Sequence, residues 1–186
     1  MQLQVSPMER CTSTKRVFDG RILKLRVDNV MFDDGMQATR EVVEHRGAAV
    51  IIPLLEDNRI LLVRQYRYAI GKELLEIPAG TCDDGEPPEI CAQRELQEET
   101  GYASDDLRKV LECYVAPGYS TEKINFYLAR NLRKTEQAPD EDERITVEPT
   151  SITEGLSKIR NGEISDAKTI CALFRMLDFV PDQLSA

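Results

Sequence analysis

The sequence predicts an α/β fold, in which a small antiparallel β unit precedes a larger domain of core strands and helices. Three observations lead to this prediction. Residues 15–44 show the two-residue alternation of strands, and residues 47–68 hold two dense apolar runs that are typical of core strands. Glycine and proline residues frame a helix at about 87–100. With 186 residues and 41% hydrophobic content, the chain is long enough to bury one core.

The N-terminal β unit is expected to span residues 1–45. Leu23, Leu25 and Val27 alternate with charged residues, and the acidic turn at 33–35 leads into a further extended segment. A denser apolar run begins directly afterwards. The boundary to the main domain, residues 46–186, is therefore expected there.

The main domain begins with two strands, in the runs 47–55 and 59–68, that are too apolar to lie at a sheet edge. A shorter strand at 73–77 enters a Pro-Ala-Gly sequence. Further strands are expected at 108–115 and 124–130.

Two helices are expected near the C-terminus. Ser151 and Glu154 fit a capping box at the start of the first. The second is expected to bury one stripe of residues at helical spacing: Ala167, Ile170, Cys171, Phe174 and Leu177.

The composition excludes several classes of function. The formal net charge of −9 argues against binding nucleic acid through surface charge. No apolar run reaches membrane-spanning length and no signal peptide is visible, so a cytoplasmic, reduced protein is expected. Five cysteines without CxxC spacing and a single histidine make zinc chemistry, a disulfide framework and histidine catalysis unfavoured. Cys91 and Cys171 are expected in the core.

The helix predicted at 87–100 carries an unusual set of carboxylates. At about 100° per residue, Glu95, Glu98 and Glu99 share a face with the small apolar residues Cys91 and Ala92. Like charges at i,i+4 and carboxylates in a last helical turn both oppose helix stability, by roughly 0.2–1 kcal/mol each. A divalent cation would offset this cost, and oxygen ligands suit Mg²⁺ or Mn²⁺. The alternative is a solvated acidic face.

The spacing of residues 80–102 decides between these readings, because it resembles the Nudix box. The matching positions are Gly80, Glu86, Arg94-Glu95-Leu96, Glu98-Glu99 and Gly101 with the apolar Tyr102. The resemblance implies an α/β/α sandwich around a mixed sheet, a metal-dependent hydrolase and a homodimer that involves the N-terminal strands. It also implies that Arg94 orients Glu98 and pairs with Glu86.

A finer resemblance points to the branch that hydrolyses ADP-ribose and other nucleoside diphosphate sugars. It rests on RQYR followed by LLEIPAG, on Pro117 fifteen residues after Tyr102, and on GEISDAKTI at 162–170. The implied reaction is hydrolysis of ADP-ribose to AMP and ribose 5-phosphate. The alternatives are GDP-mannose hydrolysis, a broad nucleoside diphosphate sugar activity, and a non-catalytic nucleotide sensor.

The resemblance also assigns roles to individual residues. The Mg²⁺ ligands are the Ala79 carbonyl, Glu95 and Glu99, with Glu98 serving a further ion or its water shell. The general base is expected in the acidic loop at 140–143, with Glu143 the first choice and Glu141 the second. Substrate contacts are assigned to Arg64, Arg67, Glu76 and Glu122, and base stacking to one of the aromatic residues Phe18, Phe32, Tyr66 and Tyr119.

Overall fold

The chain divides into two compact units. The computed structural model describes residues 8–139 and 144–180. The first unit comprises Met1–Gly47 and Tyr114–Lys123, and the second comprises Ala48–Cys113 and Ile124–Ala186. The first boundary agrees with the one predicted near residue 46, whereas the segment after Cys113 belongs with the N-terminal strands, which was not predicted.

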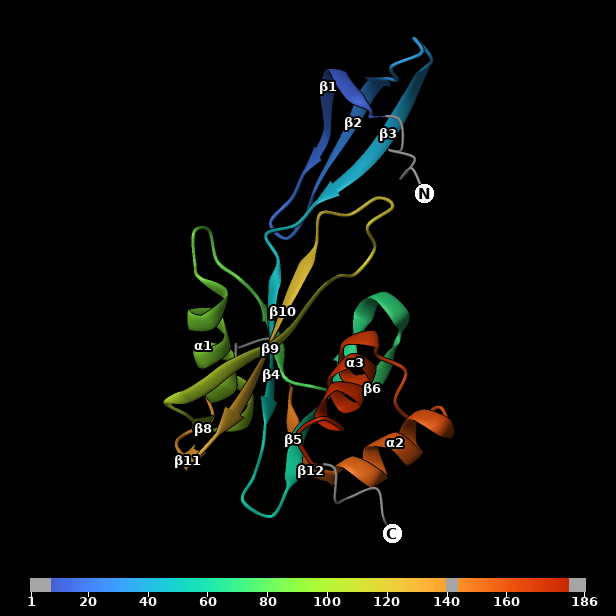
Figure 1. Cartoon of the computed structure of the whole chain (residues 1–186). Coiled ribbons are helices and arrows are strands. Elements are labelled where there is room, and N and C mark those ends of the chain that lie inside the picture. The colour runs from blue at the N-terminus through green and yellow to red at the C-terminus, as the bar shows by residue number, and fades with distance from the viewer. Residues whose placement is uncertain (1–7, 140–143, 181–186) are drawn as a thin grey trace. The chain divides into compact units, whose positions relative to one another are not determined.

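The first unit is an antiparallel sheet of β1 (Arg10–Asp19), β2 (Lys24–Met31) and β3 (Gln37–Glu44), in that order (Figure 1). The predicted turn between β2 and β3 is confirmed: Phe32 N donates to Met36 O, and Gly35 adopts φ +87°. All ten residues of β1 are exposed.

The segment Tyr114–Lys123 is tied to the end of β3 by backbone hydrogen bonds. Val43 N donates to Tyr119 O at 2.7 Å, and Thr121 N donates to Val43 O at 2.9 Å. The loop that contains Pro117 is therefore part of the first unit.

The second unit contains a mixed sheet in the order β7-β4-β10-β9, formed by β7 (Ala79–Thr81), β4 (Ala48–Pro53), β10 (Lys123–Arg130) and β9 (Asp106–Tyr114). Strand β4 runs parallel to β10 and antiparallel to β7. An antiparallel sheet has the order β12-β5-β6, from β12 (Thr146–Ser151), β5 (Arg59–Arg67) and β6 (Lys72–Glu76). A short pair, β8 (Tyr102–Ala103) and β11 (Arg133–Lys134), and the 3₁₀ turn η1 (Tyr68–Ile70) complete the strands and turns.

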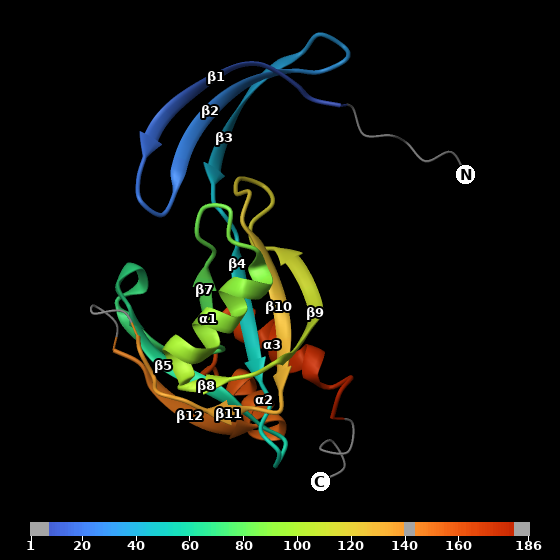
Figure 2. The ribbon, with the colours of Figure 1, turned by 90° about the vertical axis from the view of Figure 1, so that its left-hand side faces the viewer.

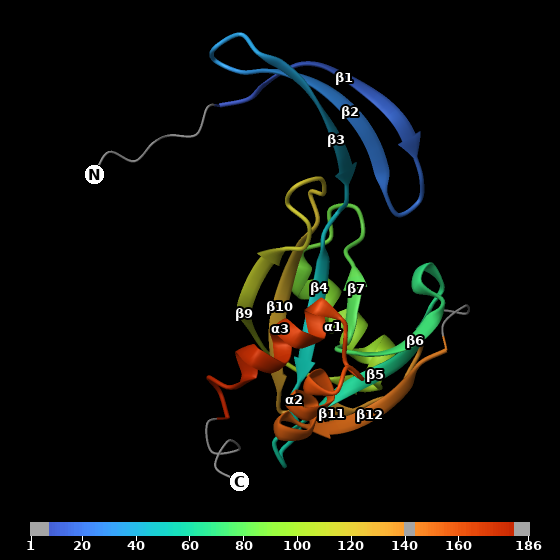
Figure 3. The ribbon, with the colours of Figure 1, turned by 90° about the vertical axis from the view of Figure 1, so that its right-hand side faces the viewer.

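Helices cover both faces of the mixed sheet. Helix α1 (Pro88–Thr100) lies on one face, and α2 (Ile152–Arg160) and α3 (Ala167–Met176) lie on the other (Figures 2 and 3). Strand β4 shows why, because all its residues are buried but alternate in direction. Val50 and Ile52 pack with buried side chains of α3, whereas Ala49 and Ile51 pack with those of α1. The predicted α/β class and sandwich are confirmed.

The predicted buried stripe of the last helix is confirmed for Ile170 and Leu177, which are partly buried against the core, and is wrong for Ala167, Cys171 and Phe174. The residues of α3 that face the core are Thr169, Ala172, Leu173 and Met176, while Cys171 is exposed and Phe174 is 54% exposed. Thr169 faces inward because its hydroxyl accepts a hydrogen bond from Ile77 N at 2.7 Å, which satisfies a buried backbone donor. Cys91, by contrast, is fully buried as expected.

The predicted capping box of α2 is present, since the Ser151 hydroxyl accepts from Glu154 N at 3.1 Å. Within residues 8–139 and 144–180, no helix combines the length and the hydropathy needed to cross a bilayer.

Candidate active site

Helix α1 positions the carboxylates of the candidate site, and local sequence sets its ends. Pro88 occupies the first helical position, where a missing N–H costs nothing. Gly101 ends the helix in the left-handed conformation, φ +71°, and its N–H donates to Gln97 O at 2.9 Å. Both predicted ends are confirmed. Helix α1 packs on β4 and β7. The loop that joins β7 to α1 is therefore short and stays close to the start of the helix.

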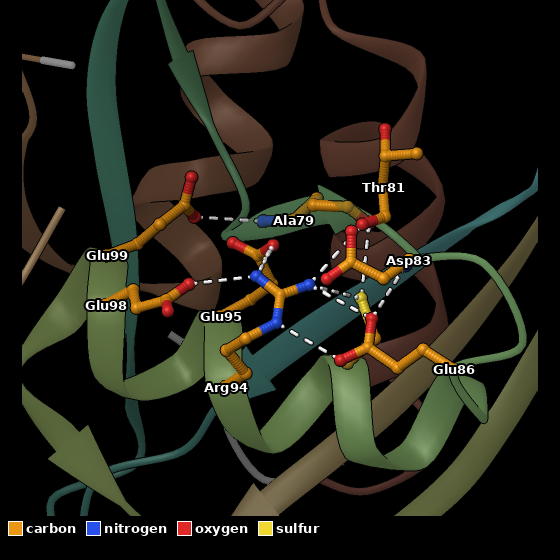
Figure 4. A network of polar contacts seen from close by, with 10 residues as sticks. Ala79, Thr81, Asp83, Glu86, Arg94, Glu95, Glu98 and Glu99 are labelled. Atoms are coloured by element: carbon orange, nitrogen blue, oxygen red, sulfur yellow. Dashed lines mark hydrogen bonds and ion pairs between the residues drawn. The ribbon is translucent and has the colours of Figure 1, made fainter. Parts of the chain in front are cut away.

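The guanidinium of Arg94 connects three carboxylates from this loop and helix (Figure 4). Its Nη1 donates to Glu95 Oε1 at 2.7 Å and to Glu98 Oε2 at 2.9 Å. Its Nε and Nη2 each donate to one oxygen of Glu86 at 3.1 Å. Both contacts expected of Arg94 are present. Glu95 is a further partner of Arg94 and shares Nη1 with Glu98.

Glu86 is held from both sides. Besides the two bonds from Arg94, its Oε2 accepts from Asp83 N at 2.9 Å. The hydrogen bonds from Arg94 lower the pKa of Glu86, since they favour the ionised carboxylate. The same contact raises the pKa of Arg94. This pair is therefore charged across the ordinary pH range and fastens the loop to the helix.

Gly80 leaves room for the carboxylate of Glu95. A Cβ built on Gly80 would lie 1.7 Å from Glu95 Oε1 and 2.0 Å from its Cδ. No other residue type fits while Glu95 keeps this position. The box glycine is thus explained by close approach of a functional side chain and not by backbone conformation.

Glu99 is anchored to the entrance of the box. Its Oε2 accepts a hydrogen bond from Ala79 N at 3.0 Å, and the residue is only 2% exposed. Ala79 therefore positions Glu99 through its amide. The expected role of the Ala79 carbonyl as a metal ligand stays a prediction.

The side chains around Arg94 fit a hard divalent cation. Three carboxylates, of Glu86, Glu95 and Glu98, contact one guanidinium, and the buried Glu99 follows on the same helix, which leaves an excess of negative charge in a partly buried region. Burying such an excess is unfavourable without a counter-charge. All the side-chain donors are carboxylate oxygens, which is the ligand type that Mg²⁺ and Mn²⁺ prefer.

A second ionic network lies between β5, β6 and α3. Arg67 donates to both oxygens of the buried Glu76, at 2.8 and 2.9 Å, and Lys168 Nζ lies 3.2 Å from Glu76 Oε2. Lys168 also donates to Asp166 at 2.7 Å. The bonds to Glu76 raise the pKa of Arg67, and the negative charge of Glu99 adds to this effect. Arg67 is thereby linked electrostatically to the box.

Arg64 does not join this network. Residues three apart on a strand point to opposite faces, so Arg64 and Arg67 lie on opposite faces of the β12-β5-β6 sheet. Arg64 Nη2 instead lies 3.0 Å from Glu148 and 3.4 Å from Glu163. The structure therefore does not bring together the two arginines that the sequence assigned jointly to phosphate or ribose.

The remaining predicted residues belong to the first unit, to an exposed position of the second unit, or to the part of the chain that the structure does not describe. Glu122 belongs to the first unit, where its N–H donates to Ser120 Oγ at 3.1 Å. Glu141 and Glu143 lie outside the described residues. Of the aromatic candidates, Tyr66 belongs to the second unit and is 54% exposed, while the others belong to the first unit.

Lys168 and Asp166 extend the network around Glu76, and neither residue was predicted to have a role. Burial opposes the charge on Lys168, but Asp166 and Glu76 outweigh it, and the pKa of Lys168 is raised. Both residues lie in the segment GEISDAKTI, residues 162–170, which contributed to the prediction only through its resemblance to the Nudix branch. A lysine two residues after an aspartate in that segment was the signal for a buried ion pair.

Known proteins resemble this chain over most of its length. The NUDIX domain model matches residues 44–173. The methanol dehydrogenase activator of Bacillus methanolicus is 38% identical over 167 residues, 89% of this chain and 90% of the relative. The ADP-ribose pyrophosphatase of Bacillus subtilis strain 168 is 34% identical with the same coverage. The GDP-mannose pyrophosphatase of Cronobacter sakazakii is 39% identical over 150 residues, 72% of this chain and 78% of the relative.

A solved structure described as an ADP compounds hydrolase superimposes with a TM-score of 0.82 at 23% identity, and the match covers 94% of this chain and 95% of that one. This likeness supports the fold alone. Together with the family match over most of the chain, the helix and its carboxylates show that this protein belongs to the Nudix family.

Proposed function

We propose that the protein hydrolyses the diphosphate bond of a nucleoside diphosphate sugar, with ADP-ribose as the favoured substrate. Water adds to one phosphorus, the bridging P–O bond breaks, and the products are AMP and ribose 5-phosphate. The observation that carries this proposal is the set of carboxylates on α1, in which Arg94 holds Glu95 and Glu98 and the Ala79 amide holds Glu99. The ADP-ribose pyrophosphatase from Bacillus subtilis, 34% identical over 89% of the chain, supports the choice of substrate.

The metal ion in this proposal is Mg²⁺ or Mn²⁺. Glu95, Glu99 and the Ala79 carbonyl would hold it, with Glu98 serving a further ion or its water shell. When bound, such ions neutralise a diphosphate and lower the pKa of water. Arg94 holds Glu95 and Glu98 side by side, and the Ala79 amide orients Glu99, so the donor atoms are positioned before any ion arrives.

The general base is assigned to the acidic loop, with Glu143 first and Glu141 second. Replacing Glu143 by Gln is expected to lower kcat by roughly 10²–10⁴ with little change in KM, because a base acts only in the transition state. Glu141→Gln is the matched comparison. Near-normal kcat in the Glu143 variant, together with a large loss in the Glu141 variant, would move the role to Glu141.

Arg67 is the arginine we assign to the substrate diphosphate or ribose. Glu76 fixes its orientation through two hydrogen bonds, while 38% of the Arg67 side chain remains exposed. Arg64 and Glu122 stay as further substrate contacts in the proposal. Kinetics of Arg67→Ala and Arg64→Ala separate the two arginines. KM is expected to rise more strongly in the first, because the negative charge of the box residue Glu99 acts on Arg67.

Substrate choice is tested by parallel rates on ADP-ribose, GDP-mannose, UDP-glucose and a dinucleoside polyphosphate in the presence of Mg²⁺. The highest kcat/KM is expected for ADP-ribose. GDP-mannose hydrolysis is the alternative, favoured by the relative from Cronobacter sakazakii, and similar rates on all sugars would indicate a broad activity. If no substrate yields a phosphate product, the enzymatic function is refuted and a nucleotide-binding sensor is the remaining hypothesis.

A homodimer also belongs to this proposal. The sheet of the first unit has one strand, β1, with every residue exposed, and Val17, Phe18 and Ile22 are each more than half exposed. Apolar side chains gathered at one strand and turn are typical of a surface that a partner covers. Phe18→Asp is expected to convert a dimer to a monomer in light scattering, and a wild-type monomer would refute the dimer. A cytoplasmic location stays a prediction, as does the expectation that the protein binds no nucleic acid.

A further inference from the structure

Two thiols and a carboxylate converge beside the box, outside the set of glutamates assigned to Mg²⁺. The Sγ atoms of Cys82 and Cys91 and a carboxylate oxygen of Glu86 all lie within 4.8 Å of one another. Among the residues that the structure describes, no other three Cys, His, Asp or Glu side chains have their ligand atoms within this distance of one another. Cys82 and Cys91 are free and buried, while Glu86 is partly exposed.

The turn between β7 and α1 creates this group. Glu86 N donates to Asp83 O at 3.0 Å, and Gly85 adopts φ +78°, so the chain folds back immediately after Cys82. Cys91 then lies one turn into α1. The sequence argued against zinc because the cysteines lack CxxC spacing, but this turn brings two cysteines nine positions apart to the same point.

We propose that Cys82, Glu86 and Cys91 form a second metal site, and that it binds Zn²⁺. Zinc takes thiolate and carboxylate ligands at about 2.3 Å and 2.0–2.2 Å in tetrahedral geometry. Ligand atoms around such an ion are separated by roughly 3.4–3.8 Å. The three ligand atoms are at most 4.8 Å apart, so small side-chain movements close the site. Each thiol releases its proton to solvent on binding.

Ligand chemistry separates this site from the box glutamates. Mg²⁺ avoids sulfur and favours oxygen, whereas zinc accepts both. The Cys91 thiol donates to the Gly80 carbonyl oxygen at 3.6 Å, a bond that is lost when zinc replaces the thiol proton, and water would take the fourth ligand position. The two sites are therefore adjacent but select different ions.

Occupation of the second site would act on the first through Arg94. Both carboxylate oxygens of Glu86 accept from Arg94, and Arg94 Nη2 also lies 3.5 Å from Cys91 Sγ. Zinc on Glu86 and Cys91 competes directly with these bonds. Since the same guanidinium holds Glu95 and Glu98, zinc is expected to inhibit Mg²⁺-dependent turnover. This inhibition rests on the proposed function, whereas the binding of zinc to the second site does not.

Cobalt spectroscopy tests binding without reference to activity. Co²⁺ replaces zinc in such sites, and thiolate ligands give a sulfur-to-cobalt charge-transfer band that carboxylate ligands lack. The reduced wild-type protein is expected to show this band at one equivalent of Co²⁺ and to lose it when Zn²⁺ is added. Cys82→Ser should reduce the band strongly, and Cys113→Ser, which alters a thiol elsewhere in the second unit, should leave it unchanged.

The outcomes that overturn the site are equally direct. A wild-type protein without the band, or a band that survives in Cys82→Ser but disappears in Cys113→Ser, would refute it. Circular dichroism of each variant confirms folding; Cys82 is chosen because it lies in the loop, whereas Cys91 is fully buried in the helix.

Inhibition by zinc tests the link to the box. Loss of an outer-shell partner already weakens metal binding by about 10–100-fold, so removal of a thiolate ligand should raise the half-inhibitory Zn²⁺ concentration by at least about tenfold. Cys113→Ser is expected to match the wild type. Equal inhibition of wild type and Cys82→Ser would refute the link. A protein without hydrolytic activity would refute the proposed function, while the cobalt band would still decide the site.

Discussion

Replacing Gly80 by alanine tests whether the position of the Glu95 carboxylate governs activity. The new Cβ would lie 1.7 Å from Glu95 Oε1, whereas ordinary contact begins at 3.4 Å. The carboxylate must therefore withdraw by about 1.7 Å, the difference between these two distances. It then loses its 2.7 Å contact with Arg94.

The structure predicts a modest loss of stability and a large loss of activity. A hydrogen bond to a charged group contributes roughly 1.5–3 kcal/mol, and a compatible Gly-to-Ala change returns about 0.4–1 kcal/mol through the unfolded chain. Unfolding free energy is thus expected to fall by about 1–2 kcal/mol. Misplacement of a functional group by 1 Å costs about 10²-fold, so kcat should fall at least that far.

Urea unfolding and a Mg²⁺ titration of the hydrolysis rate measure the two effects. Gly155→Ala is the matched control, because its Cβ would lie 2.6 Å from Leu173 Cδ2 in the contact between α2 and α3. That variant is expected to lose about 1–3 kcal/mol of stability while kcat of the folded protein stays unchanged. A Gly80→Ala protein with wild-type kcat and Mg²⁺ dependence would show that the site does not depend on this approach.

Three further predictions concern single side chains. Arg94→Lys should lower the free energy of unfolding by about 1–3 kcal/mol at neutral pH, because lysine cannot donate to both oxygens of Glu86 as the guanidinium does. Arg94 lowers the pKa of Glu86, so this wild-type advantage is present above the ordinary glutamate pKa and should shrink as pH falls below it; an undiminished difference in acid would contradict the assignment. Glu99→Gln retains an acceptor for Ala79 N, so it should fold normally yet need more Mg²⁺ for half-maximal rate, as a titration would show. Iodoacetamide should modify the exposed Cys171 much faster than Cys91, whose thiol pKa is raised by burial, as peptide mass spectrometry would reveal.

The helix of the box could be predicted closely because its determinants are local. Pro88 and Gly101 set its ends through their own backbone restrictions, and the rotation per residue places Glu95 and Glu99 with buried Cys91. These signals do not depend on distant residues. The core strands were predictable for a similar reason, since continuous apolar runs are too hydrophobic for a sheet edge.

Helix α3 shows where local reasoning fails. Hydrophobicity favoured a stripe with Cys171 and Phe174, but the helix turns Thr169 inward. The deciding partner is the amide of Ile77, far away in sequence, which needs an acceptor when buried. No property of the helix alone reveals that requirement.

By itself, the sequence determined the α/β class, the box helix and the carboxylates on its inner face, because turn residues and helical periodicity act over a few positions. Only the tertiary structure decided that Arg64 and Arg67 lie on opposite faces, that Glu76 joins Arg67 to Lys168, and that a turn brings Cys82 to Cys91. Such placements depend on strand pairing and chain reversal, which bring together residues that are far apart in the sequence.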